Sequence, residues 1–169
     1  MRFKINEIGA DGLSVNVPVT AEWLAAACPE LDARPGPHGL AVRGQLTRTG
    51  DDFLLRAELR GDIETTCGRC LEPAHVPVAA PLTITFVPTE ADHSEAEDPD
   101  VVSFGGPEID VSDEVRDEIV LALPVQALCT EACRGLCPVC GGNRNQVACN
   151  CPTEKPRAGS LGALRDIKL

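Results

Sequence analysis

Apolar and polar side chains alternate along much of the first half of the chain. The segments GLSVNVPV (12–19), DFLLRAELR (52–60), DIETTC (62–67) and PLTITFV (81–87) each place every second side chain on one apolar face. A period of two is typical of antiparallel strands with one buried face. Breaks between strands are predicted where Gly and Pro stand, at positions 9, 12, 35 to 37, 39, 50 and 61.

Two stretches have helical rather than alternating spacing. TAEWLAAAC (20–28) predicts a short helix with Thr20 as its N-cap, and Cys28 is expected to be a buried core thiol. A second helix is predicted from about 110 to 123, before Pro124. Its apolar residues at helical spacing are Val111, Val115, Ile119 and Ala122. The patterns together predict an α+β, β-rich fold: an antiparallel sheet or partial barrel with one or two helices and a small C-terminal cysteine-rich zinc-binding segment.

Composition narrows the class of protein. The chain has 169 residues, four Phe, one Trp and no Tyr, so its core must consist mainly of aliphatic side chains. There is no apolar run of signal-peptide or membrane-spanning length, which predicts a soluble, cytoplasmic protein without a membrane partner. In a reducing compartment, nine cysteines favour metal ligands or redox thiols over disulfides.

The cysteines near the C-terminus have the spacing of a metal site. Cys137-Pro-Val-Cys140-Gly-Gly is typical of a zinc knuckle, in which a tight turn directs two thiolates at one ion. Cys149 and Cys151 are two residues apart, and on an extended segment their side chains point to the same side. These four residues predict one tetrahedral Zn²⁺ site.

A second cysteine pair, Cys67 and Cys70, allows two interpretations. With Cys129 and Cys133, which stand at i, i+4 spacing, the pair would form a second four-thiolate site, so one or two structural Zn²⁺ ions are expected. Alternatively, Cys67 and Cys70 are the working pair of a thiol-based redox or zinc-responsive protein.

Charge is unevenly distributed along the chain, whose net charge is −11. Residues 89–118 hold 12 acidic and 1 basic side chains, a net −11, whereas residues 129–169 hold 6 basic and 3 acidic side chains, a net +3. The predicted organisation is a β-rich domain (1–128) with an acidic loop at 89–107, a zinc-binding module (129–151) and a basic tail (152–169).

No catalytic arrangement is evident. The histidines, His38, His75 and His93, are expected to be exposed, and none stands in a triad arrangement with a nucleophile and an Asp. The glycine-rich segments GPHG and GGN lack the lysine of a phosphate-binding loop. A site closed by four thiolates has no open coordination position, so the protein is expected to be neither an enzyme nor a binder of a small-molecule substrate.

Three segments resemble a known family. These are CGRCLEP (67–73), EIDVSDEVRDEIVLALPVQALC (108–129) and CRGLCPVCGGNRNQVACNC (133–151). Together with the tail PRAGSLGALRDIKL they resemble the YceD family of large ribosomal RNA subunit accumulation proteins, over roughly residues 50–169. The resemblance implies a β-rich N-terminal part, a cytoplasmic location, a role in large-subunit rRNA accumulation and no catalytic residue. Arg144 stands where the family has an uncharged residue.

The partner surface is predicted from charge. The leading hypothesis is a non-enzymatic ribosome-biogenesis factor that binds large-subunit rRNA or a basic ribosomal protein. An exposed acidic face on the second helix would recruit a basic partner, and cations of the cysteine-rich module would contact RNA. The candidate partner-binding residues are Asp113, Glu114, Asp117, Glu118, Arg134 and Arg144.

Overall fold

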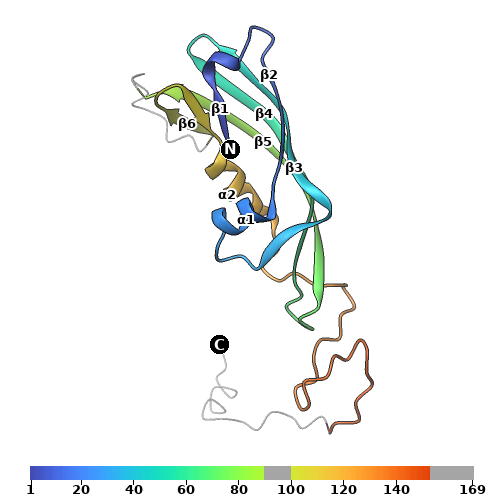
Figure 1. Ribbon diagram of the computed structural model, residues 1–169. Helices are drawn as coiled ribbons and strands as arrows, with labels where there is room; N and C mark the ends of the chain where they lie inside the picture. Colours follow the sequence, from blue (N-terminus) through green and yellow to red (C-terminus); the bar gives the residue numbers. More distant parts are fainter. Residues whose placement is uncertain (90–99, 153–169) are drawn as a thin grey trace, which may run out of the picture.

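Five strands form one curved sheet in the order β2-β3-β4-β5-β6 in the computed structural model, which describes residues 1–89 and 100–152 (Figure 1). The strands are β2 (Leu13–Pro18), β3 (Ala33–Thr49), β4 (Asp52–Thr66), β5 (Pro73–Pro88) and β6 (Val101–Phe104). The predicted antiparallel pairing is confirmed for β2 to β5, whereas β6, which no sequence pattern predicted, pairs in parallel with β5 and makes the sheet mixed. The chain re-enters the sheet with Val101 beside Thr85, so β5 and β6 do not form a hairpin. The predicted acidic loop at 89–107 therefore contains a strand, and its residues 90–99 lie outside the described part.

The strands β3 and β4 continue through two predicted breaks. A break was predicted at residues 35 to 37 and 39, yet β3 only shifts register between Pro35 and Leu40 and stays paired with β4. Asp62 explains this bulge, because its carboxylate accepts a hydrogen bond from the backbone N–H of His38 at 2.9 Å. It also lies so close to Gly36 that a Cβ atom there would be 2.1 Å from Oδ2. Only glycine fits this approach of backbone to carboxylate.

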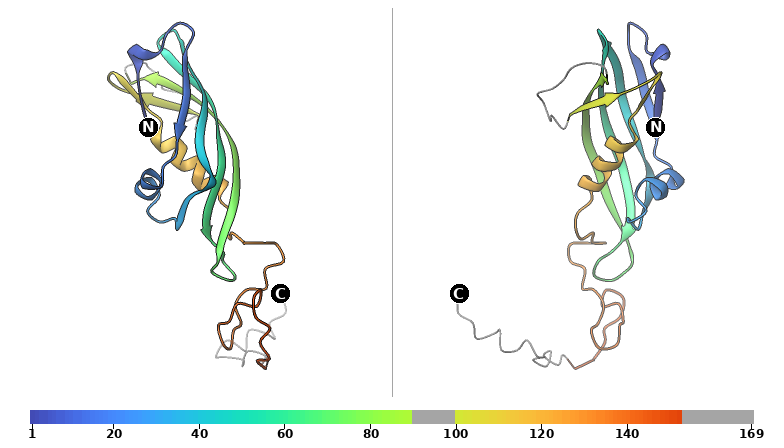
Figure 2. Two further views of the ribbon diagram at one scale, coloured as in Figure 1. Left: turned by 45° about the vertical axis from the view of Figure 1, so that its right-hand side comes forward. Right: turned by 90° about the vertical axis from the view of Figure 1, so that its left-hand side faces the viewer.

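Two helices lie on the concave face of the sheet (Figure 2). Helix α1 (Ala21–Ala27) begins as predicted, since Thr20 Oγ1 accepts a hydrogen bond from the N–H of Trp23 at 3.1 Å. Helix α2 (Ser112–Ala122) buries Val115 and Ile119 in the main core. Beside α2, β1 (Arg2–Lys4) pairs with β7 (Glu108–Asp110), and the short 3₁₀ helix η1 (Ile5–Glu7) follows β1.

The core lies between the sheet and these helices. Its largest fully buried side chains are Phe53, Phe86, Leu24, Leu46, Leu55, Leu59, Ile63, Ile109, Ile119, Val42, Val111 and Val115. Aliphatic residues dominate, as the scarcity of aromatics predicts, and Cys28 is buried among them as expected. In the described ranges, no helix is long and apolar enough to cross a membrane.

The predicted acidic face of α2 is only partly exposed. Asp113 and Asp117 face solvent, and both carboxylates accept hydrogen bonds from the guanidinium of Arg116 at 2.8 Å. The expectation that Glu114 is exposed is wrong, because its Oε2 atom is buried and has no hydrogen-bond partner among the described residues. Burial raises the pKa of Glu114 above the usual value for a glutamate. Glu118 is half-buried.

Replacing Glu114 should therefore stabilise the fold in a pH-dependent way. Above the raised folded-state pKa the wild-type carboxylate is charged and poorly solvated, so Glu114→Gln should raise the melting temperature by about 1–3 °C at pH 7. The gain should shrink as pH falls through that pKa and disappear below about pH 4, where the glutamate is neutral in both states. Thermal melts between pH 4 and 8 measure this, with Glu118→Gln as the control. An equal gain at every pH would contradict the explanation.

Candidate metal centres

Two Cys-x-x-Cys turns adopt the same backbone conformation. In the first, the N–H of Leu71 donates to the carbonyl of Cys67 at 3.0 Å, and in the second the N–H of Gly141 donates to the carbonyl of Cys137 at 2.9 Å. In both turns the residue after the second cysteine has a positive φ, +62° at Leu71 and +71° at Gly141. Both are therefore knuckles that present two sulfur atoms on the same side of a tight turn.

The similarity of the two turns could not be predicted from the sequence, because Leu71 stands in the first turn where Gly141 stands in the second. A left-handed backbone is ordinary for Gly141, but a bulky side chain adopts it at a cost of about 1 kcal/mol or more. The Leu71 side chain is 66% exposed and gains little from packing. The hydrogen bond from Leu71 N–H to Cys67 supports the turn, so the conformation is imposed by the knuckle and not by residue preference.

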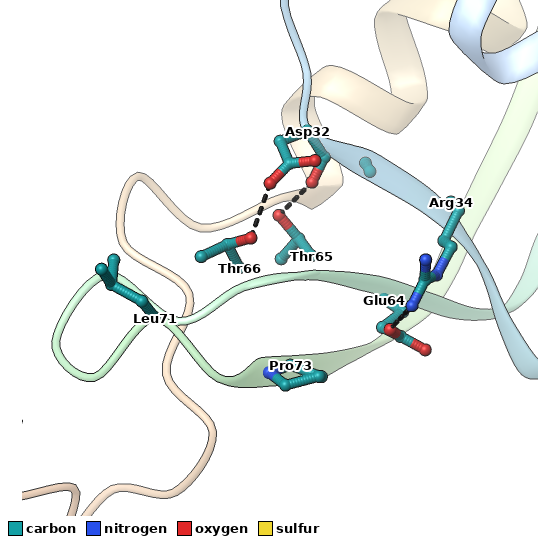
Figure 3. Close-up of a pocket in the computed structure, with 8 residues that line it drawn as sticks. Asp32, Arg34, Glu64, Thr65, Thr66, Leu71 and Pro73 are labelled. Atoms are coloured by element: carbon teal, nitrogen blue, oxygen red, sulfur yellow. Dashed lines mark hydrogen bonds and ion pairs between the residues drawn. The ribbon is translucent and has the colours of Figure 1, made fainter. Parts of the chain in front are cut away.

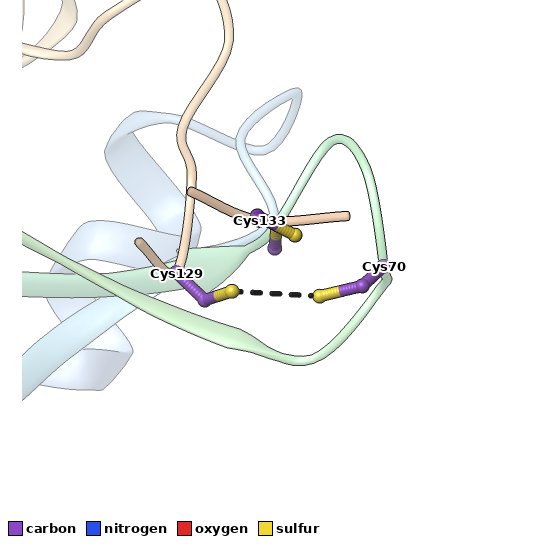
Figure 4. Close-up of side chains that lie close together, drawn as sticks. Cys70, Cys129 and Cys133 are labelled. Carbon is purple, nitrogen blue, oxygen red and sulfur yellow. Dashed lines mark hydrogen bonds between the residues drawn. The ribbon is translucent and has the colours of Figure 1, made fainter. Parts of the chain in front are cut away.

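The first cysteine group joins the tip of the β4–β5 hairpin to the segment after α2. The sulfur atoms of Cys67, Cys70, Cys129 and Cys133 all lie within 4.8 Å of one another. Sγ of Cys67 is 3.8 Å from that of Cys133, and Sγ of Cys70 is 3.5 Å from that of Cys129 (Figure 4). Bonds of about 2.3 Å in a tetrahedral zinc site put two ligand sulfurs about 3.8 Å apart, so this group fits a metal ion.

Backbone and side-chain contacts hold this first group together. The N–H of Gly68 donates to the carbonyl of Ala127 at 2.9 Å, which fixes the hairpin tip against the returning chain. The guanidinium of Arg69 donates to the carbonyl of Cys133 at 3.2 Å. Cys67 is completely buried, and Ala74, Leu128 and Leu136 pack around the sulfurs.

The second group comes from the C-terminal knuckle and the chain that follows it. The sulfur atoms of Cys137, Cys140, Cys149 and Cys151 also lie within 4.8 Å of one another, which suits one ion. Cys137 is buried and Cys140 is exposed. Both four-cysteine sets predicted from spacing are therefore brought together, and each could hold a metal ion.

The thiols within each group differ in acidity. Burial opposes ionisation of Cys67, but N–H groups, foremost that of Arg69, stabilise its thiolate and lower its pKa to about 6. The N–H groups of Cys140 and Val139 lower the pKa of Cys137 to about 6. The N–H of Glu72 favours the thiolate of Cys70, but burial and the neighbouring thiols raise its pKa to about 12. Four thiolates this close repel one another, so full ionisation requires a cation between them.

The loop between Cys140 and Cys149, in the second cysteine group, contacts the sulfur atom of Cys133 in the first group. The side-chain amide of Asn145 donates to Sγ of Cys133 at 3.3 Å, while its oxygen accepts from the N–H of Arg134 at 2.8 Å. Glu72, beside the first knuckle, accepts hydrogen bonds from Asn143 at 3.3 Å and from Gln146 at 3.2 Å. Asn145 and Glu72 were not among the residues predicted from the sequence, because no spacing pattern reveals contacts between two loops.

The candidate partner-binding residues do not form one surface. The acidic residues belong to α2, whereas Arg134 and Arg144 belong to the cysteine-rich segment beyond the end of the sheet (Figure 1). Both arginines are exposed, and neither guanidinium makes an ion pair within the described ranges.

A small pocket of about 180 Å³ lies beside the first knuckle, between the start of β3 and the end of β4 (Figure 3). Its hydroxyl groups are already satisfied, since Thr65 and Thr66 donate to the carbonyl and the carboxylate of Asp32, both at 2.6 Å. Arg34 is paired with Glu64. The polar groups that line this pocket therefore contact one another.

The histidines of the described part do not make a catalytic site either. His38 and His75 are exposed, as expected, and both approach Oδ2 of Asp62, at 3.5 Å and 3.9 Å. Within the described ranges, neither imidazole forms a hydrogen bond with a serine, threonine or cysteine side chain. His93 lies outside the described residues.

Comparisons with known proteins point to one family. Residues 55–168 match the family described as "Large ribosomal RNA subunit accumulation protein YceD". "Large ribosomal RNA subunit accumulation protein YCED homolog 1, chloroplastic" of Arabidopsis thaliana is 41% identical over 61 residues, 35% of this chain and 19% of that protein. Its namesake from Zea mays is 45% identical over 51 residues, 30% of this chain and 16% of that protein.

A bacterial relative extends the comparison. An uncharacterized protein of Mycobacterium tuberculosis is 36% identical over 76 residues, which are 44% of this chain and 37% of that protein. The matched stretches thus cover less than two fifths of each of these three relatives. No solved structure matches the chain.

The hydrogen bond from Asn145 to Sγ of Cys133 predicts that Asn145 strengthens metal binding by the first cysteine group, although Asn145 is not itself a ligand. Asn145→Ala removes the amide that donates to Cys133, and outer contacts of this kind typically change metal affinity by about 10-fold or more. Chelator titration of cobalt-substituted protein, followed by thiolate-to-cobalt absorption, should show easier release from the first group. Gln146→Ala, which removes a contact of the same loop to Glu72 but not to a sulfur, is the matched control. Identical release curves for the two variants would contradict the assigned role.

Proposed function

The chain belongs to the YceD family, and we propose that it promotes the accumulation of large-subunit ribosomal RNA as a non-enzymatic, cytoplasmic assembly factor. The observation that carries this proposal is the family match over residues 55–168, which includes both cysteine groups. The factor would act by binding rRNA or a basic ribosomal protein. The name of the plant relatives supports the role in rRNA accumulation.

Each cysteine group is proposed to hold one structural Zn²⁺ ion. Four thiolates at tetrahedral spacing are the donor set that zinc prefers, and they leave no coordination position for a substrate or a reactive water. The ligands would be Cys67, Cys70, Cys129 and Cys133 in one site, and Cys137, Cys140, Cys149 and Cys151 in the other. Their role would be to cross-link a segment that has little apolar surface of its own to bury.

The redox alternative, with Cys67 and Cys70 as the working pair, has weaker support. The lowered pKa of Cys67 favours it. However, Cys67 is completely buried, so a disulfide substrate has no access to its sulfur. Each of these two sulfur atoms also contacts a sulfur of the segment after α2, since Cys67 lies 3.8 Å from Cys133 and Cys70 lies 3.5 Å from Cys129.

Metal analysis tests the two-site proposal. Protein purified under reducing conditions should contain about two equivalents of Zn²⁺, and Cys137→Ser should lose about one. The circular dichroism of the sheet should persist in this variant, while the chain near residues 137–151 becomes sensitive to protease. Cys28→Ala, which alters a cysteine outside both groups, should keep two equivalents. Less than half an equivalent of zinc in fresh, reduced wild-type protein would overturn the proposal.

The acidic part of α2 is proposed to contact a basic component of the large subunit. Reversal of the two exposed carboxylates, Asp113→Lys with Asp117→Lys, should lower co-purification with large-subunit particles severalfold, and raised salt should weaken the wild-type association. Glu114 and Glu118 remain candidate contacts, but Glu114 is left unchanged in this test because it is partly buried.

The control for this charge reversal is Glu7→Lys with Asp11→Lys, an equal change of charge at two exposed residues outside α2. Nuclease treatment before purification separates a protein partner from an RNA partner. Wild-type levels of association by the α2 variant, with unchanged salt sensitivity, would show that this surface is not used.

A further inference from the structure

The middle of the outer face of the sheet is locally positive, although the chain has a net charge of −11. Toward the β4–β5 hairpin tip the charges on this face are balanced, because Arg34 pairs with Glu64 and the carboxylate of Asp62 lies 3.5 Å from His38. Farther along β3 and β4, three exposed arginines, Arg43, Arg56 and Arg60, stand beside only one carboxylate, that of the half-buried Glu58.

Strand register places the three arginines next to one another. Arg43 on β3 lies opposite Glu58 on β4, and Arg56 and Arg60 flank Glu58 two residues away on either side. Adjacent strands are about 4.8 Å apart and second neighbours along a strand about 6.8 Å apart, so the three Cα atoms form a triangle around Glu58.

Two of these arginines have no acidic partner. Arg60 lies 3.7 Å from the carboxylate of Glu58. Arg43 and Arg56 make no hydrogen bond or ion pair with any residue of the described part. Uncharged polar side chains surround them, because Asn16 lies opposite Arg43 and both Gln45 and Thr83 lie opposite Arg56.

We propose that this outer face, centred on Arg43, Arg56 and Arg60, binds the phosphate backbone of RNA. The inference rests on the proposed function and narrows it, since it makes RNA a direct partner and assigns the surface. Arginine forms paired hydrogen bonds with phosphate oxygens, and Asn, Gln and Thr side chains commonly add further backbone contacts. The face carries no Phe, Trp or Tyr side chain, so it would bind the phosphate backbone of RNA without stacking on its bases.

The distribution of charge on the rest of the molecule also favours RNA binding at the outer face of the sheet. Helix α2 lies on the concave side of the sheet, opposite the outer face (Figure 2). Its residues Asp113 and Asp117 are exposed. Two divalent ions with eight thiolates would also add a formal charge of −4 at the cysteine-rich end. RNA is therefore repelled from these regions and attracted to the outer face of the sheet.

Fluorescence anisotropy with a labelled 20-nucleotide single-stranded RNA of mixed sequence tests the proposal on the full, zinc-loaded chain. Three phosphate contacts imply that log K falls with log salt with a slope of about −2, or about 20-fold between 50 and 200 mM salt. Arg43→Gln, Arg56→Gln and Arg60→Gln together should weaken binding at least about 10-fold at 50 mM salt and bring the slope close to zero.

A matched variant removes three exposed arginines outside this face, Arg48→Gln, Arg134→Gln and Arg144→Gln. It should keep most of the affinity and the slope. If instead this control loses binding while the face variant binds like the wild type, the RNA surface lies elsewhere and the inference is overturned. Unchanged thermal melts of both variants establish that they are folded.

The same experiment separates failure of the inference from failure of the proposed function. If the wild-type chain binds no RNA yet co-purifies with large-subunit particles after nuclease treatment, the assembly role stands and the RNA-binding face is refuted. If it neither binds RNA nor associates with such particles, both are refuted.

Discussion

The convergence of four sulfur atoms at the β4–β5 hairpin tip is the constraint on which the described segment after α2, residues 123–152, depends. Cys67 and Cys70 belong to the end of the sheet, and Cys129 and Cys133 to the segment that leaves α2. Further links follow from that junction, including the bond from Leu136 N–H to Arg69 and the contact of Asn145 with Cys133. The apolar cluster at this junction is small, so polar and sulfur contacts replace the hydrophobic core that holds the rest of the fold.

The sheet and the cysteine-rich end are thus stabilised by different interactions: a large apolar core in the first, and sulfur and polar contacts in the second. In the sheet, alternation buries one face and exposes the other, and the exposed face accommodates charged side chains such as Arg43, Arg56 and Arg60. At the cysteine-rich end, the two Cys-x-x-Cys turns bring pairs of sulfur atoms together, and hydrogen bonds from the side chains of Asn143 and Asn145 connect the loop after the second turn to Glu72 and Cys133. Leu71 is a bulky residue held in a left-handed conformation in the first of these turns.

Sequence patterns predicted those features that arise from local periodicity or spacing. The strands around Leu55 and Ile84, the core face of α2 and the grouping of cysteines follow from periods of two, from helical spacing and from Cys-x-x-Cys turns. A break was predicted at 35 to 37 and 39, where β3 only bulges, because the cause of continued pairing, the Asp62 carboxylate, lies on another strand. The same limit applies to the parallel pairing of β6 and the buried oxygen of Glu114, which depend on neighbours distant in sequence.

The division of the first cysteine group between two segments has a consequence for the time course of protein synthesis. Cys70 and Cys129 are separated by 59 positions. At elongation rates of roughly 5–20 residues per second, the ribosome adds Cys129 roughly 3–12 s after Cys70. During that interval the hairpin of the nascent chain carries two thiols without their partners, and closure of the junction must wait until α2 has been made.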